Sequence, residues 1–487
     1  MHYLCVAALW AASLLPIAFA EEDYDDKKSP FKYVIAISID GLHSSDVPKY
    51  LGLRPKSNIA ALLEVGYEYT NAYTSAPSDS FPGTLAQFTG SSPKTTGVWY
   101  DDIWRRDYFA PGSDCKGRPG AEVEQAENLD YNDTLLFSGG INPDNLAKKV
   151  VNGTCQKMYP HNTIRVNTAF EVVRNRGLQT AYADKHPAYD IVRGPSGKGL
   201  TVGYFPEITG VPNTVDAVIG YDQLHVDAWL AWLDARTPEH SEGKLTAIPS
   251  LFGGNFQCIN VAQKTVGYLN GTGNPFSPAL LKALDFVDNC LGALVKKLKE
   301  KKIYEETLII VASKHGQAPI DPRLYKKVDP KIITNLTQVP IVSQTSDDIA
   351  LLFLNKSSDT ETAVRNLKAG AQKAEIASVI YGDELKANYG DPVRDPSVPD
   401  IIVLPNLGVI YTNSKTKVAE HGGFSSEDRN VAFFVSNPKL HKRQIKDRVY
   451  TTQVAPTILA ALGIDPRELE GVRAEGTKLP PGFKGFD

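Results

Sequence analysis

The segment Tyr33-Val-Ile-Ala-Ile-Ser-Ile39 is a continuous apolar run of strand length, and Asp40-Gly41 follows it directly. A run without polar alternation is typical of a strand buried on both faces of a parallel sheet. Thr307-Leu-Ile-Ile-Val-Ala-Ser313 repeats the pattern and ends at Lys314-His315-Gly316. Because parallel strands present ligand-binding residues at their carboxyl ends, we expect Asp40, Lys314 and His315 to meet at one edge of a sheet.

Strands and helices alternate along the rest of the chain. The clearest helix is expected to begin at Pro278 with Ser277 as its N-cap, because Leu280, Leu284 and later apolar residues recur at spacings of three and four. A second helix is expected over residues 451–462, and shorter strands over residues 178–183, 245–251, 400–404 and 431–435. This alternation predicts an α/β fold with a doubly wound, mostly parallel sheet and helices on both faces.

The length of 487 residues suits one large domain with insertions. Residues 101–165 and 325–400 are less regular than the rest, and we interpret them as insertions into a single domain over residues 21–487. Residues 3–20 are apolar and end on Ala18-Phe19-Ala20 before an acidic stretch. This predicts a signal peptide over residues 1–20 and a secreted, extracellular protein, with an uncleaved anchor as the alternative. No membrane span is expected after the signal.

Four cysteines remain once Cys5 leaves with the signal, and an even number in an oxidising compartment predicts two disulfides. Three pairings are possible, and nearness in sequence favours Cys115–Cys155 and Cys258–Cys290. Glycosylation sequons on a secreted surface lie at Asn132, Asn152, Asn270, Asn335 and Asn355.

The charge balance argues against a nucleic-acid-binding face. The formal net charge is −4 and the sequence pI is about 6.2, so no polycationic surface is expected. A charged substrate would therefore be met by local groups.

Ser80 stands in Pro77-Ser78-Asp79-Ser80-Phe81-Pro82-Gly83, a pattern that places a hydroxyl at a helix N-terminus. Backbone N–H groups and the helix dipole favour an anion there, and a serine at that point can attack one. Taken alone, such a serine is more often an N-cap than a nucleophile. Asp40, Lys314-His315-Gly316 and Glu420-His421-Gly422-Gly423 make the nucleophile the stronger interpretation.

Taken in order, these motifs and Thr452-Gln-Val-Ala-Pro-Thr-Ile-Leu-Ala-Ala-Leu-Gly-Ile464 resemble the alkaline phosphatase superfamily over most of residues 33–465. The nearest branch resembles the type I phosphodiesterases and nucleotide pyrophosphatases. That family is expected to use two zinc ions beside a Ser or Thr nucleophile in phosphate ester hydrolysis. The resemblance implies a small phosphate ester as substrate.

Carried over residue by residue, Ser80 matches the nucleophile, and three residues match metal ligands. Asp40 and His315 match ligands of the metal that activates the nucleophile, and His421 matches a ligand of the other metal. Imidazole and carboxylate groups suit zinc, and a cation stabilises both a serine alkoxide and a transferring phosphoryl group.

The chain departs from the family pattern at several positions. Lys314 replaces a carboxylate ligand, and Asn255 and Gln257 stand where an Asp and a His are expected five residues apart. Gly83 stands where the family usually has an asparagine after Phe-Pro. The side-chain amide of that asparagine would donate to the transition state, and Gly83 removes this donor. The departures predict one divalent ion, zinc first, or none, and make a two-zinc site doubtful.

Two functions follow from this pattern. In the first, Lys314 replaces one cation and is catalytic with Ser80, while Asn255 and Gln257 point into the cleft near His421 and donate hydrogen bonds to the substrate where a second metal would sit. In the second, catalysis is lost and the cleft binds a ligand. A sulfatase is a distant third, because it would need an oxidised Cys in place of Ser80.

Asp184-Lys185-His186 follows an expected strand and should share this rim of the sheet. Lys185 and His186 are therefore further candidate substrate-binding residues, and Asp184 or His186 could replace a lost ligand. A histidine at a strand end is, however, more often structural.

Overall fold

The computed structural model describes residues 31–483. The predicted signal peptide and Cys5 lie outside these residues. A nine-stranded sheet forms the centre, in the order β10-β9-β8-β11-β1-β12-β19-β2-β20. Its members are β10 (Glu242–Gly243), β9 (Val202–Tyr204), β8 (Thr180–Ala183), β11 (Leu251–Phe256), β1 (Tyr33–Ile39), β12 (Thr307–Ala312), β19 (Phe433–Ser436), β2 (Gly66–Tyr69) and β20 (Arg443–Ile445).

The sheet is mixed, with a parallel centre. Strands β9, β8, β11, β1 and β12 run parallel, whereas β10 and β19 pair antiparallel to their neighbours. The apolar runs predicted as strands are β1 and β12, which pair with each other in register Ala36↔Ile310. Asp40 and Lys314 therefore leave the sheet at the same edge, as the sequence predicts.

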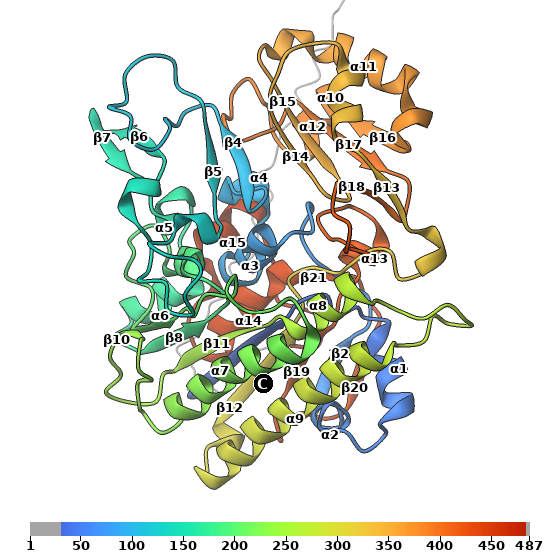
Figure 1. The fold of residues 1–487 in the computed structure, drawn as a ribbon. Coiled ribbons are helices and arrows are strands. Elements are labelled where there is room, and N and C mark those ends of the chain that lie inside the picture. The colour runs from blue at the N-terminus through green and yellow to red at the C-terminus, as the bar shows by residue number, and fades with distance from the viewer. Residues whose placement is uncertain (1–30, 484–487) are drawn as a thin grey trace, which may run out of the picture.

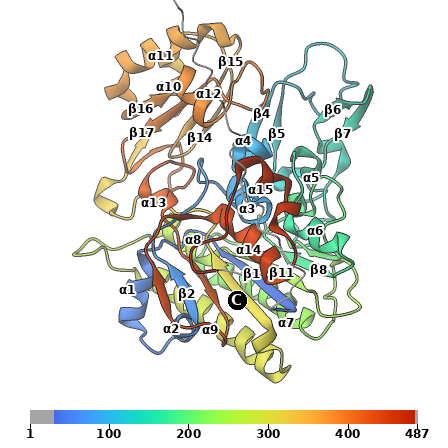
Figure 2. The ribbon, with the colours of Figure 1, turned by 180° about the vertical axis from the view of Figure 1, so that it is seen from behind.

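Helices cover both faces of the sheet, as expected for a doubly wound fold (Figures 1 and 2). Ile35, Ile37 and Ile39 of β1 point toward one group of helices, and Val34 and Ala36 point toward the other. The first group is α2 (Asn58–Glu64), α7 (Val215–Trp232), α8 (Cys258–Thr265) and α9 (Pro278–Glu300). The second is α3 (Ser80–Thr89), α6 (Ala169–Asn175), α14 (Val454–Ala461) and α15 (Glu470–Glu475).

Helix α9 begins as the sequence predicts, with the Ser277 side chain accepting a hydrogen bond from Leu280 N and Pro278 as the first residue. The strand expected over residues 245–251 is wrong, since β11 begins at Leu251 and carries Gly253 and Gly254 in its middle. Two glycines weaken the apolar signal, yet a Cβ at Gly253 would lie only 1.7 Å from the Ala36 carbonyl oxygen. Close contact between β11 and β1 explains the glycine.

The two less regular stretches carry small sheets of their own. Within residues 101–165, two hairpins form: β4 (Asp102–Arg105) with β5 (Ala121–Glu124), and β6 (Lys148–Val151) with β7 (Thr154–Lys157). A four-stranded sheet in the order β14-β15-β17-β16 lies apart from the central sheet, above it in Figure 1. It comprises β14 (Ile341–Ser346), β15 (Ala350–Leu354), β17 (Ile401–Pro405) and β16 (Ile376–Ile380), with α10 (Lys331–Thr337), α11 (Thr360–Ala369) and α12 (Gly382–Asn388). The division into one domain with insertions stays a prediction.

Short elements complete the described chain. They are α1 (Asp46–Leu53), β3 (Ala72–Tyr73), α4 (Pro93–Thr96), α5 (Pro160–Thr163), β13 (Lys326–Val328), β18 (Val409–Tyr411), α13 (Ser426–Arg429) and β21 (Val449–Tyr450). Within residues 31–483, no helix combines the length and apolar character needed to cross a bilayer.

One of the two expected disulfides is present. Cys115 and Cys155 are bonded, whereas the expected Cys258–Cys290 bond is wrong, because both residues are free thiols buried in the core. Cys258 opens α8 and its thiol lies 3.9 Å from the Ala283 carbonyl oxygen, which it faces as a weak donor. Nearness in sequence did not predict how these two helices orient their cysteines.

Candidate active site

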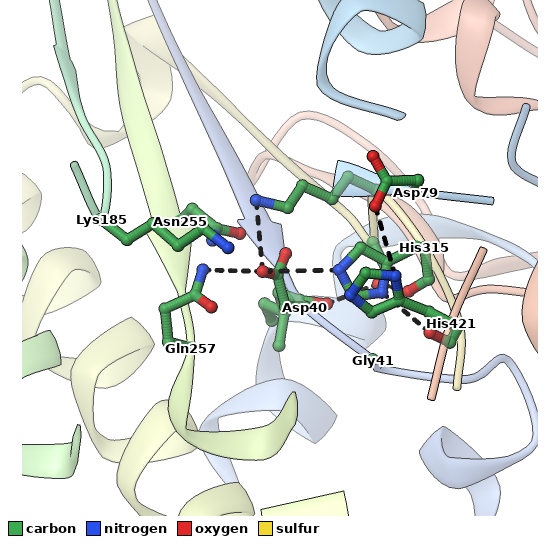
Figure 3. Close-up of polar contacts among 12 residues, drawn as sticks. Asp40, Gly41, Asp79, Lys185, Asn255, Gln257, His315 and His421 are labelled. Carbon is green, nitrogen blue, oxygen red and sulfur yellow. Dashed lines mark hydrogen bonds and ion pairs between the residues drawn. The ribbon is translucent and has the colours of Figure 1, made fainter. Parts of the chain in front are cut away.

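Asp40 is the centre of a buried polar cluster at the carboxyl end of β1 (Figure 3). Its Oδ2 atom accepts a hydrogen bond of 2.7 Å from Gln257 Nε2 and lies 3.2 Å from Lys314 Nζ and 3.6 Å from His315 Nε2. Burial alone would raise the pKa of Asp40, but Lys314 and His315 lower it below the usual range. Asp40 is therefore an ionised carboxylate held by its neighbours.

Ser80 is the first residue of α3 and does not cap it. Asp79 is the N-cap, and its Oδ2 accepts a hydrogen bond from Phe81 N. The Ser80 side chain is left free by this arrangement. Its Oγ is buried beside the Tyr189 hydroxyl and has no hydrogen bond of standard geometry within residues 31–483. A free hydroxyl at the positive end of a ten-residue helix fits a nucleophile better than a cap.

Lys314 is fully buried and links Asp40 to Tyr189, a residue that no sequence motif indicated. Besides the Asp40 pair, its ammonium donates a 2.7 Å hydrogen bond to the Tyr189 hydroxyl. Helix α3 reaches this position only because residue 83 is glycine. A Cβ there would lie 2.0 Å from the Lys314 carbonyl oxygen.

The two candidate metal-binding histidines lie against each other, with ring centroids 3.8 Å apart. His421 Nδ1 lies 3.4 Å from Asp79 Oδ1, and His421 Nε2 lies 3.3 Å from Lys264 Nζ. Burial lowers the pKa of both rings, and at His421 the neighbouring His315 ring and the Lys264 ammonium lower it further. Both rings are therefore neutral imidazoles in the folded protein.

Glu420 balances the positive charges next to His421. It forms ion pairs with Lys264 and Lys417. Burial alone would raise its pKa, yet these two lysines lower the pKa of Glu420 to about 2. Tyr100 holds the same loop, because its hydroxyl donates to the His421 carbonyl oxygen at 3.2 Å.

Asn255 and Gln257 lie in this cluster, but on the Asp40 side and not against His421, where they were expected. Gln257 Nε2 donates to Asp40 Oδ2, while Asn255 Nδ2 lies 3.4 Å from Asp184 Oδ1. Asn255 is also the fifth residue of β11, not a residue beyond it. Asn255 Oδ1 is buried without a partner in the described chain, so this oxygen can still accept a hydrogen bond.

The Asp184-Lys185-His186 segment contributes the Lys185 cation and the buried Asp184 carboxyl group to the cluster. Opposing carboxylates, Asp40 and Glu127 foremost, outweigh burial and raise the pKa of Lys185, so it stays charged. His186 packs against the rings of both Phe81 and Tyr189, and burial lowers its pKa to about 3. The structural interpretation of His186 therefore has the better support.

These residues do not fit a pair of metal ions. Asp40 Oδ1 and His315 Nε2 are buried without a hydrogen bond in the described part of the chain and could each bind a cation, but the Lys314 ammonium beside Asp40 opposes one. Within residues 31–483, the only three carboxylate, thiolate or imidazole groups close enough to share an ion are Asp102, Glu122 and Glu124, on the β4–β5 hairpin. One ion or none stays the prediction for this site.

Three residues of the site were missed: Tyr189, Lys264 and Asp79. Asp79 carried a signal, because an Asp before Ser-Phe-Pro is a typical N-cap. Nothing in the sequence placed Tyr189 or Lys264 here, since they come from a 3₁₀ segment and from α8.

Comparison with known proteins supports the expected relationship. The family model described as type I phosphodiesterase / nucleotide pyrophosphatase matches residues 34–428. No curated protein sequence matches significantly. Among solved structures, murine ectonucleotide pyrophosphatase / phosphodiesterase 5 aligns with a TM-score of 0.57 and 15% identity, covering 89% of this chain and 96% of that one.

Two further solved structures give the same result. An inactive variant of the murine protein in complex with AMP gives a TM-score of 0.57 at 15% identity, over 90% of this chain and 96% of that one. The human protein gives 0.56 at 14% identity, over 89% and 95%. At these identities the likeness establishes a shared fold.

Proposed function

Since this chain belongs to the type I phosphodiesterase / nucleotide pyrophosphatase family, we propose that it hydrolyses small phosphate esters with Ser80 as the nucleophile. The observation that carries the proposal is the free, buried Ser80 hydroxyl at the N-terminus of α3, in the same cluster as Asp40 and Lys314. Both phosphodiesters and phosphomonoesters fit this chemistry. The AMP complex of the murine relative makes a nucleotide ester one substrate to test.

In this proposal the Lys314 ammonium supplies charge that a metal supplies elsewhere in the family. Ser80 Oγ gives its proton to water and forms a bond to phosphorus while the ester P–O bond breaks, and the leaving oxygen takes up a proton from water. A water oxygen then bonds to phosphorus, the Ser80 Oγ–P bond breaks, and Ser80 Oγ regains a proton from water. Lys314 and the α3 N-terminus stabilise the phosphoryl oxygens, and Lys185 adds a second cation.

A second candidate is phosphate ester binding without hydrolysis. It is favoured by Asp40, whose Oδ2 is occupied by Gln257 and Lys314, and by the poor fit of the site to two ions. A site built from these residues could hold a phosphate group while lacking the cations that drive its transfer.

Turnover of an aryl phosphodiester and an aryl phosphomonoester, with and without chelator, separates the candidates. If Lys314 replaces a metal, activity persists in chelator, and Lys314→Ala and Ser80→Ala lose comparable activity because both groups serve one step. Lys314→Asp alone should not restore activity, since the site would still lack ligands. No turnover above the Ser80→Ala background favours the binding protein, and full inhibition by chelator contradicts the lysine mechanism alone.

We also propose that the protein is secreted. The proposal rests on the apolar segment ending at Ala20, outside the described residues, and on the Cys115–Cys155 disulfide, which suits an oxidising compartment. Edman sequencing of the mature protein should begin at Glu21. A chain that retains Met1 on a membrane would contradict the cleaved signal.

A further inference from the structure

The Tyr189 hydroxyl lies between the proposed nucleophile and the buried cation. Lys314 Nζ is 2.7 Å from this hydroxyl, and the Ser80 side chain is a further polar neighbour. Tyr189 belongs to the 3₁₀ segment Pro187–Arg193 and is completely buried. The mechanism above gives it no task, although it contacts Lys314 and lies beside Ser80.

The direction of the hydrogen bonds follows from the chemistry of the groups. An ammonium can only donate, so the Tyr189 oxygen accepts from Lys314 and its own O–H is free to donate elsewhere. Burial and the carboxylates Asp184 and Asp40 raise the pKa of Tyr189, so the phenol keeps its proton. The Ser80 oxygen beside it has no hydrogen bond of standard geometry in the described chain and can accept one.

The ring of Tyr189 is held by packing, so its hydroxyl has little freedom. Phe81 stacks on the ring with centroids 4.7 Å apart, and the His186 ring meets it edge-on at 4.9 Å. Phe81 directly follows Ser80 in α3, and therefore the same contact that fixes the Tyr189 ring also fixes the first turn of the helix.

We propose that Tyr189 is a positioning residue for Ser80. Its hydroxyl accepts a hydrogen bond from Lys314 and donates one to Ser80 Oγ, which holds the nucleophile in one rotamer and ties it to the cation. This inference rests on the proposed function of Ser80. It assigns to Tyr189 a role in the rate of attack and not in the affinity for substrate.

Tyr189→Phe tests the proposal, because it removes the hydroxyl and keeps the stacked ring. We expect kcat for the aryl ester to fall about 10²-fold, the usual effect of losing one preorganised donor, with KM nearly unchanged. Tyr411→Phe is the matched control. Tyr411 is also buried, and its hydroxyl makes one hydrogen bond, to the Ala374 carbonyl oxygen, in the small four-stranded subdomain.

Capture of Ser80 by a fluorophosphonate gives a readout that does not need turnover. The Ser80 Oγ–P bond forms, the P–F bond breaks, fluoride leaves and the hydroxyl proton goes to solvent. Mass spectrometry of the Ser80 peptide follows the rate. We expect a fall similar to that in kcat for Tyr189→Phe and no change for Tyr411→Phe. Because Tyr189→Phe leaves the buried Lys314 ammonium with one acceptor fewer, its melting temperature should also fall, and all rates are therefore taken per folded molecule.

The two readouts separate failure of the inference from failure of the proposed function. If the wild type lacks turnover but captures the probe in a Tyr189-dependent way, the hydrolase is wrong and the positioning role stands. If capture is absent in the wild type, or equal in the wild type and Tyr189→Phe, the inference is overturned. A fall in kcat with unchanged capture, or a rise in KM alone, overturns it as well.

Discussion

The Lys314–Asp40 pair places two opposite charges where neither is exposed to solvent. Such a pair contributes little net stability, since desolvation offsets the attraction, but removing one partner leaves a buried charge without compensation. The folded-state pKa of Asp40 is lowered, so its contribution to stability is present above its unfolded pKa, near 3.9, and is lost as the pH falls below it. Asp40 is therefore ionised in the folded protein at neutral pH.

Lys314→Met should therefore destabilise the protein by about 3–5 kcal/mol at neutral pH. Adding Asp40→Asn should recover most of this loss, because the unpaired carboxylate is gone. Urea unfolding of the two single variants and the double variant measures the effect. A double variant no more stable than Lys314→Met would contradict a coupled pair. The same measurement shows whether lost activity in a Lys314 variant reflects unfolding.

At the scale of elements, the seat of α3 against the loop after β12 depends on Gly83. The related family usually has asparagine there, but any Cβ would meet the Lys314 carbonyl oxygen. The glycine therefore lets the start of α3 lie closer to the Lys314 backbone than a side chain at residue 83 allows.

Gly83→Ala should push α3 away from Lys314, costing about 1–3 kcal/mol and lowering turnover beyond the loss of folded protein. Gly52→Ala is the control, since this glycine lies in α1 with nothing within 4 Å of an added Cβ. That variant should be as stable as the wild type or more stable by about 0.4–1 kcal/mol. Thermal melting and activity per folded molecule give both values. Equal effects of the two substitutions would contradict the close contact.

Sequence patterns predicted the elements whose signal is local. The unbroken apolar runs gave β1 and β12, and the Ser277-Pro278 cap gave the start of α9. The prediction placed strand β11 too early in the chain. Gly253 is required by its close contact with β1, and a local sequence pattern carries no information on a contact between distant segments.

The same distinction between local patterns and distant contacts holds for the residues of the candidate site. Asp40 and Lys314 were brought together by strand pairing, which the sequence indicates. The positions of Tyr189 and Lys264 depend on how separate segments pack, and no spacing rule reports that.

At the scale of the whole molecule, two buried carboxyl groups lie where the segment over residues 101–165 meets the central sheet. Asp130 lies in this segment and Glu207 follows β9, and both are almost fully buried. The same junction is held by a backbone hydrogen bond from Glu207 N to the Leu136 carbonyl oxygen. Burial raises the pKa of both acids, and nearby Glu127 adds like charge.

Acids with a raised folded-state pKa stabilise the fold below their unfolded pKa, about 4, and lose that contribution as the pH rises through the folded value. Because of this pair, the wild-type melting temperature should therefore fall as the pH rises from about 4 to about 8.

Glu207→Gln removes one of the two charges while its oxygen can still accept from Thr209 N. We expect this variant to melt above the wild type at pH 8, with the difference shrinking toward pH 4. Glu361→Gln, on the exposed side of α11, should follow the wild-type curve throughout. A Glu207→Gln curve parallel to the wild type at every pH would contradict the prediction that burial of the two carboxyl groups makes stability depend on pH. Limited proteolysis at pH 8 would show whether the wild type opens within residues 101–165.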